Sequence, residues 1–445
     1  MRTLSYHALA FFMVCICATA AGAAERPNVL LIMADDVGCD AIGCYGGASY
    51  PTPHIDKLAA GGIRFDNCYS MPSCHPTRTT LLTGRYPRRL GNPKWGSFPQ
   101  NEERNTIAQV AKAAGYKTAV AGKWQLSLLS RDLDQPHRMG FDHYALFGWH
   151  EGPRYYQPLI FQDGSRRDDV ADAYGPDVYS DALIDFMRRN KNERFFAYFP
   201  MALCHDVTDD LEQPVPYGPR GRYDSFAEMM AEMDRIVGKV ITAVDELGLR
   251  ENTVILFTGD NGTPMRSIIR HVKRKANDED IDVDRKGYVR RPVYSLYNNR
   301  LVQGGKTQLI DAGTHVPLIV SWPGTISPEQ VTDDLVDFSD FLPTIAELTG
   351  GEPPAGVTLD GHSFASRLTE GTPSPRKWAY AEARGKYWVR SKDFKLYDDG
   401  QFFCVKYDPL EAHVLKVDTP FGFTDDAEQA LQQLQAALNS VKSFK

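Results

Sequence analysis

The sequence predicts an α/β fold in which a large, mostly parallel sheet is flanked by helices and joined to a small antiparallel C-terminal subdomain. Three observations support this fold class. Short, continuous apolar runs alternate with amphipathic segments through residue 350, as in parallel sheets that are buried on both faces. The chain has 445 residues, 42% of them hydrophobic, which suits one large domain with an accessory domain. Beyond a Pro-rich stretch near residue 355, short aromatic strands such as 386–390 and 394–397 replace the alternation.

The N-terminus has the composition of a secretory signal. An apolar run over residues 8–18 follows Arg2, and small residues at 21–23 suit a cleavage site. The apolar run is short for a membrane span, and no second stretch is long enough. We therefore expect a secreted or periplasmic protein with no stable membrane span. Its predicted divisions are a signal peptide over 1–23, a main domain over 24–355 and an α+β subdomain over 356–445.

Charge and cysteine content exclude two classes of protein. The formal net charge of -7 argues against a nucleic-acid partner. Removal of the signal would leave six of the eight cysteines, which is too few for a disulfide scaffold. Cys39 and Cys44 are close enough in sequence to form a disulfide, and two unpaired thiols fit at least as well.

The first predicted strand is the apolar run 28–34, and Asp35 and Asp36 follow it directly. These carboxylates would lie at the C-terminal edge of the sheet, where open α/β sheets bind ligands. Adjacent carboxylates repel each other unless a cation joins them, and their oxygens suit Ca²⁺ or Mg²⁺. An isolated Asp-Asp pair is more often a plain turn. However, Asp260 and Asn261 follow the predicted strand 252–258 in the same way, and the two pairs together indicate a metal site far more specifically.

A helix is predicted to begin near Cys74, in the sequence Ser-Cys-His-Pro-Thr-Arg. Pro76 suits the first turn, where a missing N–H costs nothing. Cys74 would then lie at a helix N-terminus, where backbone N–H groups favour negative charge. Arg78, one turn later, offers a planar fork of donors that suits an oxyanion. A buried cysteine followed by a surface arginine is the plainer alternative.

Two further strands end close to polar side chains. A strand over 116–121 delivers Lys123 and Gln125 to a loop, and a strand over 195–199 leads to His205. Histidine titrates near neutral pH and is therefore a candidate acid, although a lone histidine is more often structural.

Residues 263–300 are strongly charged. Nine Lys or Arg lie between Arg266 and Arg291, against five acids, which favours a solvated insertion. A sharper hypothesis is that Arg270, Lys273 and Arg274 contact an anionic substrate. Lys306 follows two glycines, and this motif alone would be a flexible turn. The other predicted elements are helices over 52–60, 106–114, 225–247, 338–348 and 425–442 and a strand within 316–324.

Taken together, these motifs resemble those of the type I, formylglycine-dependent sulfatases of the alkaline phosphatase superfamily. The sequence from Cys74 to Arg78 is similar to the family's Cys-X-Pro-Ser-Arg core, with Thr77 in place of serine, and a Thr-Gly-Arg turn follows at 83–85. Further similarities are the strand with its Asp-Asp pair, Gly-Lys-Trp at 122–124, Asp-Asn-Gly at 260–262 and Gly-Gly-Lys at 304–306. The resemblance covers roughly residues 26–410.

The resemblance implies an exported sulfuric ester hydrolase that acts on a sulfated carbohydrate. In this family a maturation enzyme oxidises the cysteine to formylglycine, whose hydrate attacks sulfur, and the resulting ester collapses by elimination. Carried over by position, the implied Ca²⁺ ligands are Asp35, Asp36, Cys74, Asp260 and Asn261, the catalytic residues are Cys74, Arg78, Lys123, His205 and Lys306, and the substrate-binding residues are Gln125, Lys123 and Lys306.

Besides Thr77, three positions depart from the family pattern. Gln125 replaces a histidine, and glutamine can position a ligand but cannot take up a proton near neutral pH. Gly259 replaces a serine, and Val207 stands where a proline is usual. Two other functions remain open: a phosphodiesterase or phosphonate hydrolase using the same nucleophile on phosphorus, and a non-catalytic protein that binds sulfated glycans. The retained nucleophile argues against the second.

Overall fold

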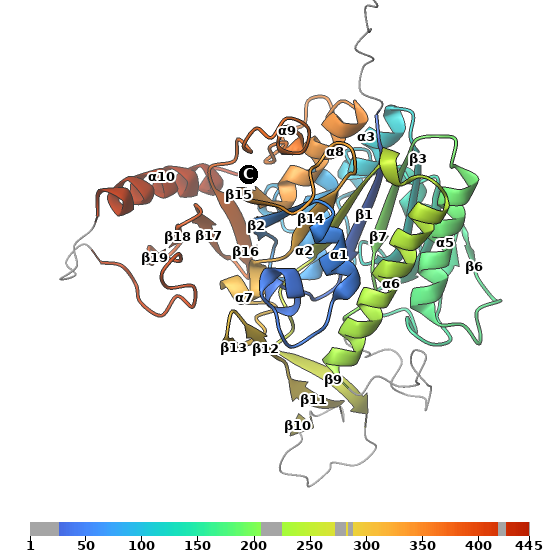
Figure 1. Ribbon diagram of the computed structural model, residues 1–445, viewed down its shortest axis with the longest axis horizontal. Coiled ribbons are helices and arrows are strands. Elements are labelled where there is room, and N and C mark those ends of the chain that lie inside the picture. The colour runs from blue at the N-terminus through green and yellow to red at the C-terminus, as the bar shows by residue number, and fades with distance from the viewer. Residues whose placement is uncertain (1–25, 206–224, 272–281, 284–287, 417–423, 445) are drawn as a thin grey trace, which may run out of the picture.

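A computed structural model describes residues 26–205, 225–271, 282–283, 288–416 and 424–444 of the chain (Figure 1). The predicted signal peptide, Val207, Lys273 and Arg274 lie outside these residues. Within the described residues, no helix has the length and apolar character needed to cross a membrane.

The core of the described structure is a sheet of ten strands in the order β15-β2-β14-β8-β1-β7-β3-β4-β5-β6. Its strands are β1 (Asn28–Ala34), β2 (Ile63–Tyr69), β3 (Lys117–Trp124), β4 (His143–Gly148), β5 (Phe161–Gln162), β6 (Ser165–Arg166), β7 (Phe195–Pro200), β8 (Thr253–Gly259), β14 (Leu318–Ser321) and β15 (Gln330–Asp337). Strands β8, β1, β7, β3 and β4 run parallel, whereas β14 is antiparallel to both of its neighbours. The predicted fold class is confirmed, with a parallel centre inside a mixed sheet.

Helices cover both faces of this sheet because alternate residues of each strand point to opposite sides. In β1, Leu30 and Ile32 pack in one cluster with residues of α1 (Pro53–Ala60), α5 (Gly175–Arg189) and α6 (Phe226–Glu246). Val29 and Leu31 pack in a second cluster with residues of α2 (Cys74–Thr83), α3 (Ile107–Ala113) and α8 (Phe341–Thr349). Figure 1 shows these helices as the two outer layers. The shorter helices are α4 (Gln135–Arg138), α7 (Asp311–Thr314) and α9 (Ala365–Thr369).

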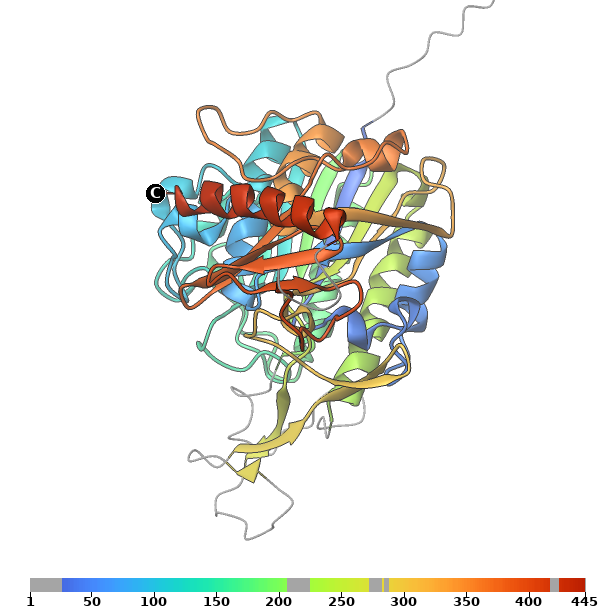
Figure 2. The ribbon, with the colours of Figure 1, turned by 90° about the vertical axis from the view of Figure 1, so that its left-hand side faces the viewer.

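A separate antiparallel sheet follows near the C-terminus. Its strands are β16 (Ala379–Ala383), β17 (Lys386–Arg390), β18 (Phe394–Tyr397) and β19 (Phe402–Cys404). Helix α10 (Asp425–Lys442) lies across this sheet (Figure 2). Asp311 links α7 to this sheet, because it pairs with Arg390 of β17 at 2.9 Å and with Lys395 of β18 at 2.6 Å.

The structure differs from the sequence prediction in two places. The insertion at 263–300 contains strands β9 (Arg266–His271), β10 (Asp282–Val283), β11 (Tyr288–Pro292), β12 (Tyr294–Tyr297) and β13 (Arg300–Gln303), which project from the main body (Figure 1). Its many charges mask the alternation that marks a strand. Strand β3 extends to Trp124, so Lys123 lies within a strand, where it is paired with Phe147 of β4. The six cysteines from Cys39 to Cys404 are all free.

Candidate functional site

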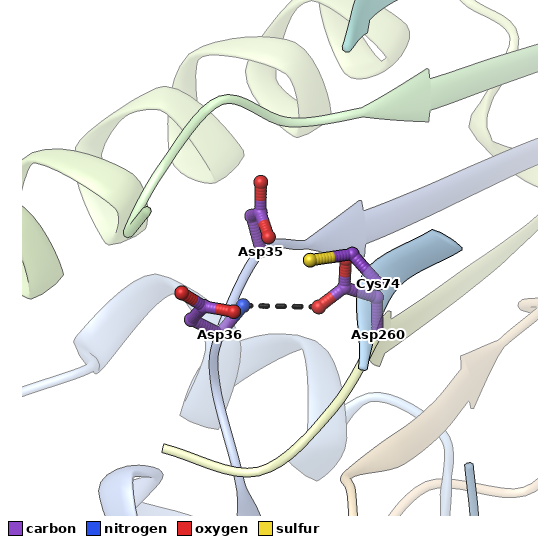
Figure 3. A group of neighbouring side chains, drawn as sticks. All are labelled: Asp35, Asp36, Cys74 and Asp260. Carbon is purple, nitrogen blue, oxygen red and sulfur yellow. Dashed lines mark hydrogen bonds between the residues drawn. The ribbon is translucent and has the colours of Figure 1, made fainter. Parts of the chain in front are cut away.

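The two strand-end acidic pairs meet because β1 and β8 are parallel neighbours. Their register places Ala34 beside Gly259, so Asp35 and Asp36 emerge next to Asp260. The backbone N–H of Asp36 donates to Oδ1 of Asp260 at 3.0 Å (Figure 3). Position 259 has no room for a side chain, since a Cβ there would lie 2.0 Å from the carbonyl oxygen of Val37. A serine at this position would therefore require the backbone at Val37 to shift.

Cys74 is the first residue of α2 and points into this acidic cluster. One ligand atom from each of Asp35, Asp36, Cys74 and Asp260 lies within 4.8 Å of the others, and all four side chains are buried. Figure 3 shows the sulfur directed between the carboxylates of Asp35 and Asp36. Burial raises the pKa of the Cys74 thiol to about 12. An unmodified thiol in this position would be protonated and a poor nucleophile at neutral pH.

Each of the three buried carboxylates pairs with a cation. Lys123 Nζ is 2.5 Å from Asp35, and Lys306 Nζ is 2.6 Å from Asp36. Arg78 Nη2 is 2.7 Å from Asp260. The side chain of Lys306 is 17% exposed, whereas those of Arg78 and Lys123 are almost wholly buried, so Lys306 lies nearest to solvent.

The carboxylates titrate abnormally because they are buried together. Burial and the neighbouring Asp35 raise the pKa of Asp260 to about 7, against the lowering effect of Arg78. Burial likewise raises the pKa of Asp36, although Lys306 opposes it. Burial would also raise the pKa of Asp35, but Lys123, His205 and Arg78 together lower it. The paired cations therefore offset the effect of burial at Asp35, but only in part at Asp36 and Asp260.

A hard cation fits these residues. Oδ1 of Asp35 and Oδ1 of Asn261 are buried and accept no hydrogen bond from any described residue. The amide nitrogen of Asn261 donates to Asp36 at 2.9 Å, which leaves its oxygen facing away from that bond. Unsatisfied buried oxygens are costly, and oxygens of carboxylate and amide groups are the ligands that Ca²⁺ and Mg²⁺ prefer. Asp35, Asp36, Asp260 and Asn261 could therefore hold such an ion next to residue 74.

His205 follows β7 and is held by a residue that the sequence did not single out. Arg154, which is buried, lies with Nη1 3.4 Å from Nδ1 of His205. Because arginine only donates, Nδ1 must accept, so the neutral ring carries its proton on Nε2. Burial, Lys306 and Lys123 lower the pKa of His205 well below its usual value. A neutral His205 can donate a hydrogen bond from Nε2. Arg154 belongs to no motif and lies in the loop between β4 and β5, so no sequence signal singled it out.

Gln125 directly follows β3, two residues after Lys123 in the chain, and its side chain is buried. Its Oε1 has no hydrogen-bond partner among the described residues. Gln125 is thus a buried amide with spare hydrogen-bonding capacity. Contacts bring eight other predicted residues together: Asp35, Asp36, Cys74, Arg78, Lys123, Asp260, Asn261 and Lys306.

Comparison with known proteins gives a consistent result. The family model described as Sulfatase matches residues 27–351. Human arylsulfatase A is 30% identical over 84% of this chain and 75% of its own length. Human N-acetylgalactosamine-6-sulfatase is 27% identical over 86% of this chain and 76% of its own length.

Solved structures share the fold. The PsFucS1 sulfatase from Pseudoalteromonas sp. superposes with a TM-score of 0.72 at 24% identity, covering 94% of this chain and 91% of its own. A protein solved in complex with its substrate D-glucosamine-2-N,6-O-disulfate gives a TM-score of 0.67 at 21% identity, covering 94% of this chain and 98% of its own.

Proposed function

The chain belongs to the type I sulfatase family of the alkaline phosphatase superfamily and is a sulfuric ester hydrolase, and we propose that it is exported and acts on a sulfated carbohydrate. The observation that carries the proposal is the buried cluster of Asp35, Asp36, Asp260 and Cys74, whose ligand atoms lie within 4.8 Å of one another beside three cations. The carbohydrate part rests on structural neighbours, one of which was solved with a disulfated glucosamine as its substrate.

In this proposal residue 74 is oxidised by a maturation enzyme, and formylglycine, once hydrated, supplies the oxygen nucleophile that a buried thiol cannot. Asp35, Asp36, Asp260 and Asn261, together with residue 74, would hold Ca²⁺. Such an ion would supply positive charge that favours binding of the sulfate group.

The chain's own cations complete the anion site. Arg78, Lys123 and Lys306 bind the sulfate and stabilise the negative charge that develops on its oxygens, a contribution that often dominates enzymatic catalysis. His205 donates from Nε2 to the departing alcohol oxygen, and Lys306, which lies nearest to solvent, assists it. Gln125 orients the sulfate through its amide but moves no proton. We also propose that the catalytic domain spans 24–355 and that 356–445 forms the accessory subdomain.

The test begins with the nucleophile. Protein produced in a host that has the maturation enzyme is digested with trypsin, and the peptide Phe65–Arg78 is analysed by mass spectrometry. We expect formylglycine at position 74 and hydrolysis of 4-nitrophenyl sulfate. An unmodified thiol would overturn the formylglycine mechanism, and faster hydrolysis of an aryl phosphate diester than of the aryl sulfate would overturn the assignment of a sulfate ester as substrate.

A further inference from the structure

A pocket of about 510 Å³ opens beside the candidate site, within the size range of natural ligand pockets. Its walls come from the start of α2, the segment before Trp95 and the turn between β16 and β17. We call it the hairpin pocket. Ser73 and Thr307 line it. Ser73 directly precedes Cys74 in the chain, and Thr307 directly follows Lys306. The N–H of Thr307 donates to the carbonyl of Pro72 at 2.7 Å, which fixes the pocket wall to the site.

One wall of the hairpin pocket is an aromatic platform. The indole of Trp95 is stacked on the ring of His75, with centroids 6.3 Å apart and planes 20° apart. His75 is buried, and its Nε2 lies 2.7 Å from the carbonyl oxygen of Ser97, so the ring beneath the tryptophan is fixed. Trp149 supports Trp95 from another side, with ring centroids 5.9 Å apart. Trp95 nevertheless remains 45% exposed, so much of this large apolar ring faces outward.

A cation stands at the rim of the same pocket. Arg384 and Gly385 form the two-residue turn between β16 and β17, with φ of 53° and 82°. Hairpin turns of this kind strongly favour Asn-Gly, because the first residue must adopt the left-handed conformation. Arginine in that position breaks the local preference, which is typical of functional sites. Arg384 is exposed and forms no ion pair with any described residue, so its guanidinium is available to an anion.

The acid in the pocket wall has described partners other than Arg384. Glu382 is buried and accepts a hydrogen bond of 2.7 Å from the backbone N–H of Arg88. A second pocket of about 510 Å³ shares Thr307, Ala383 and Arg384 with the first, so the depression continues past the arginine.

We propose that the hairpin pocket binds the sugar unit next to the sulfated one, and that this unit bears an anionic substituent. The apolar C–H face of the sugar ring packs on Trp95, and its carboxylate binds Arg384 through charge-assisted hydrogen bonds. This inference rests on the proposed sulfatase function and specifies its substrate: an acidic, sulfated oligosaccharide rather than a neutral one.

The experiment compares two sulfated disaccharides that differ only in the second sugar. One contains a uronic acid, and the other contains the same unit with its carboxyl group reduced to the alcohol. Each disaccharide is prepared with the sulfate at each available position of the sulfated sugar, and kcat/KM for sulfate release is measured for every isomer. We expect the wild-type enzyme to prefer the acidic disaccharide about tenfold or more, as for a hydrogen bond to a charged group.

Variants of the pocket then assign that preference. Arg384→Asn suits the left-handed turn and should reduce the preference to near unity, whereas Arg384→Lys should retain part of it. Trp95→Ala should raise KM for both disaccharides, and Trp95→Phe should restore most of the affinity. Arg189→Ala removes an equal charge from α5, at the opposite side of the molecule in Figure 1, and should leave the preference unchanged.

The outcomes separate the two proposals. Absence of sulfate release by the wild-type enzyme from 4-nitrophenyl sulfate and from every sulfated disaccharide would refute the sulfatase function itself. Sulfate release with equal rates on the two disaccharides, or with a preference that survives in Arg384→Asn, would refute only the role of the hairpin pocket.

Discussion

The change Lys123→Met tests whether the acidic cluster binds Ca²⁺. Lys123 and Asp35 form a buried ion pair of 2.5 Å whose side chains are 3% and 0% exposed. Removing one partner of such a pair leaves the other charge buried and costs about 3–5 kcal/mol of the free energy of unfolding. We expect that full cost in the presence of a chelator. With Ca²⁺ bound to Asp35, the cost should fall below about 2 kcal/mol, because a charge near 4 Å attracts a carboxylate by about 4 kcal/mol.

Lys395→Met is the matched control for this experiment. Lys395 is also fully buried and pairs with Asp311 at 2.6 Å and with Glu411 at 2.5 Å, in the C-terminal sheet. Its replacement should cost a similar free energy, equally with Ca²⁺ and with chelator. Both variants are measured by urea unfolding in each condition. If Ca²⁺ leaves the cost of Lys123→Met unchanged, or reduces the two costs equally, Asp35 is not a ligand of the ion.

Three further changes test local features. Gly259→Ser should destabilise the fold by about 1–3 kcal/mol in thermal unfolding, because its Cβ would lie 2.0 Å from the Val37 carbonyl oxygen. Gly61→Ser is the control and should be nearly neutral, because the nearest atom to a Cβ at that position is 3.6 Å away. Asp311→Asn should destabilise the folded protein at neutral pH, because its two paired cations outweigh burial and lower the pKa of Asp311 below 3.8. The difference in stability between wild type and variant should shrink as the pH falls below about 4, where the wild-type carboxylate begins to lose its charge. A difference that stays constant with pH would contradict this ion-pair account. Gln125→Leu should lower kcat/KM for 4-nitrophenyl sulfate about tenfold if the amide hydrogen-bonds the sulfate, and an unchanged value would remove Gln125 from the site.

The strand ends of the site could be predicted because the signal is local. The run 28–34 is apolar enough to be a buried strand, and the acids after it must lie at the sheet edge. The same holds for 253–259 and Asp260. Parallel pairing of β1 with β8 then brings the two ends together, although the sequence does not state that register.

The hairpin pocket and Arg154 could not be predicted in this way. The pocket joins segments near residues 73, 95, 307 and 384, and no local pattern indicates that these distant segments meet. The positive φ of Arg384 could not be predicted from the sequence either, because arginine is not a residue that indicates a left-handed turn. Strands β9 to β13 were missed because charged side chains on an exposed ribbon do not need hydrophobic alternation. The sequence alone therefore does not reveal contacts between distant segments, or side chains whose position depends on those contacts.

The balance of charges explains why cation and anion binding should be coupled at this site. With all three carboxylates ionised, the side chains sum to zero charge, because three carboxylates face three cations at 2.5–2.7 Å: Asp35 with Lys123, Asp36 with Lys306, and Asp260 with Arg78. A neutral cluster has little net attraction for a sulfate ester, and its cations are already paired. A divalent ion held by the carboxylates would raise the net charge to about +2 and compete with the lysines and arginine for those oxygens. The same cations would then be released towards the substrate, so each ligand strengthens the binding of the other.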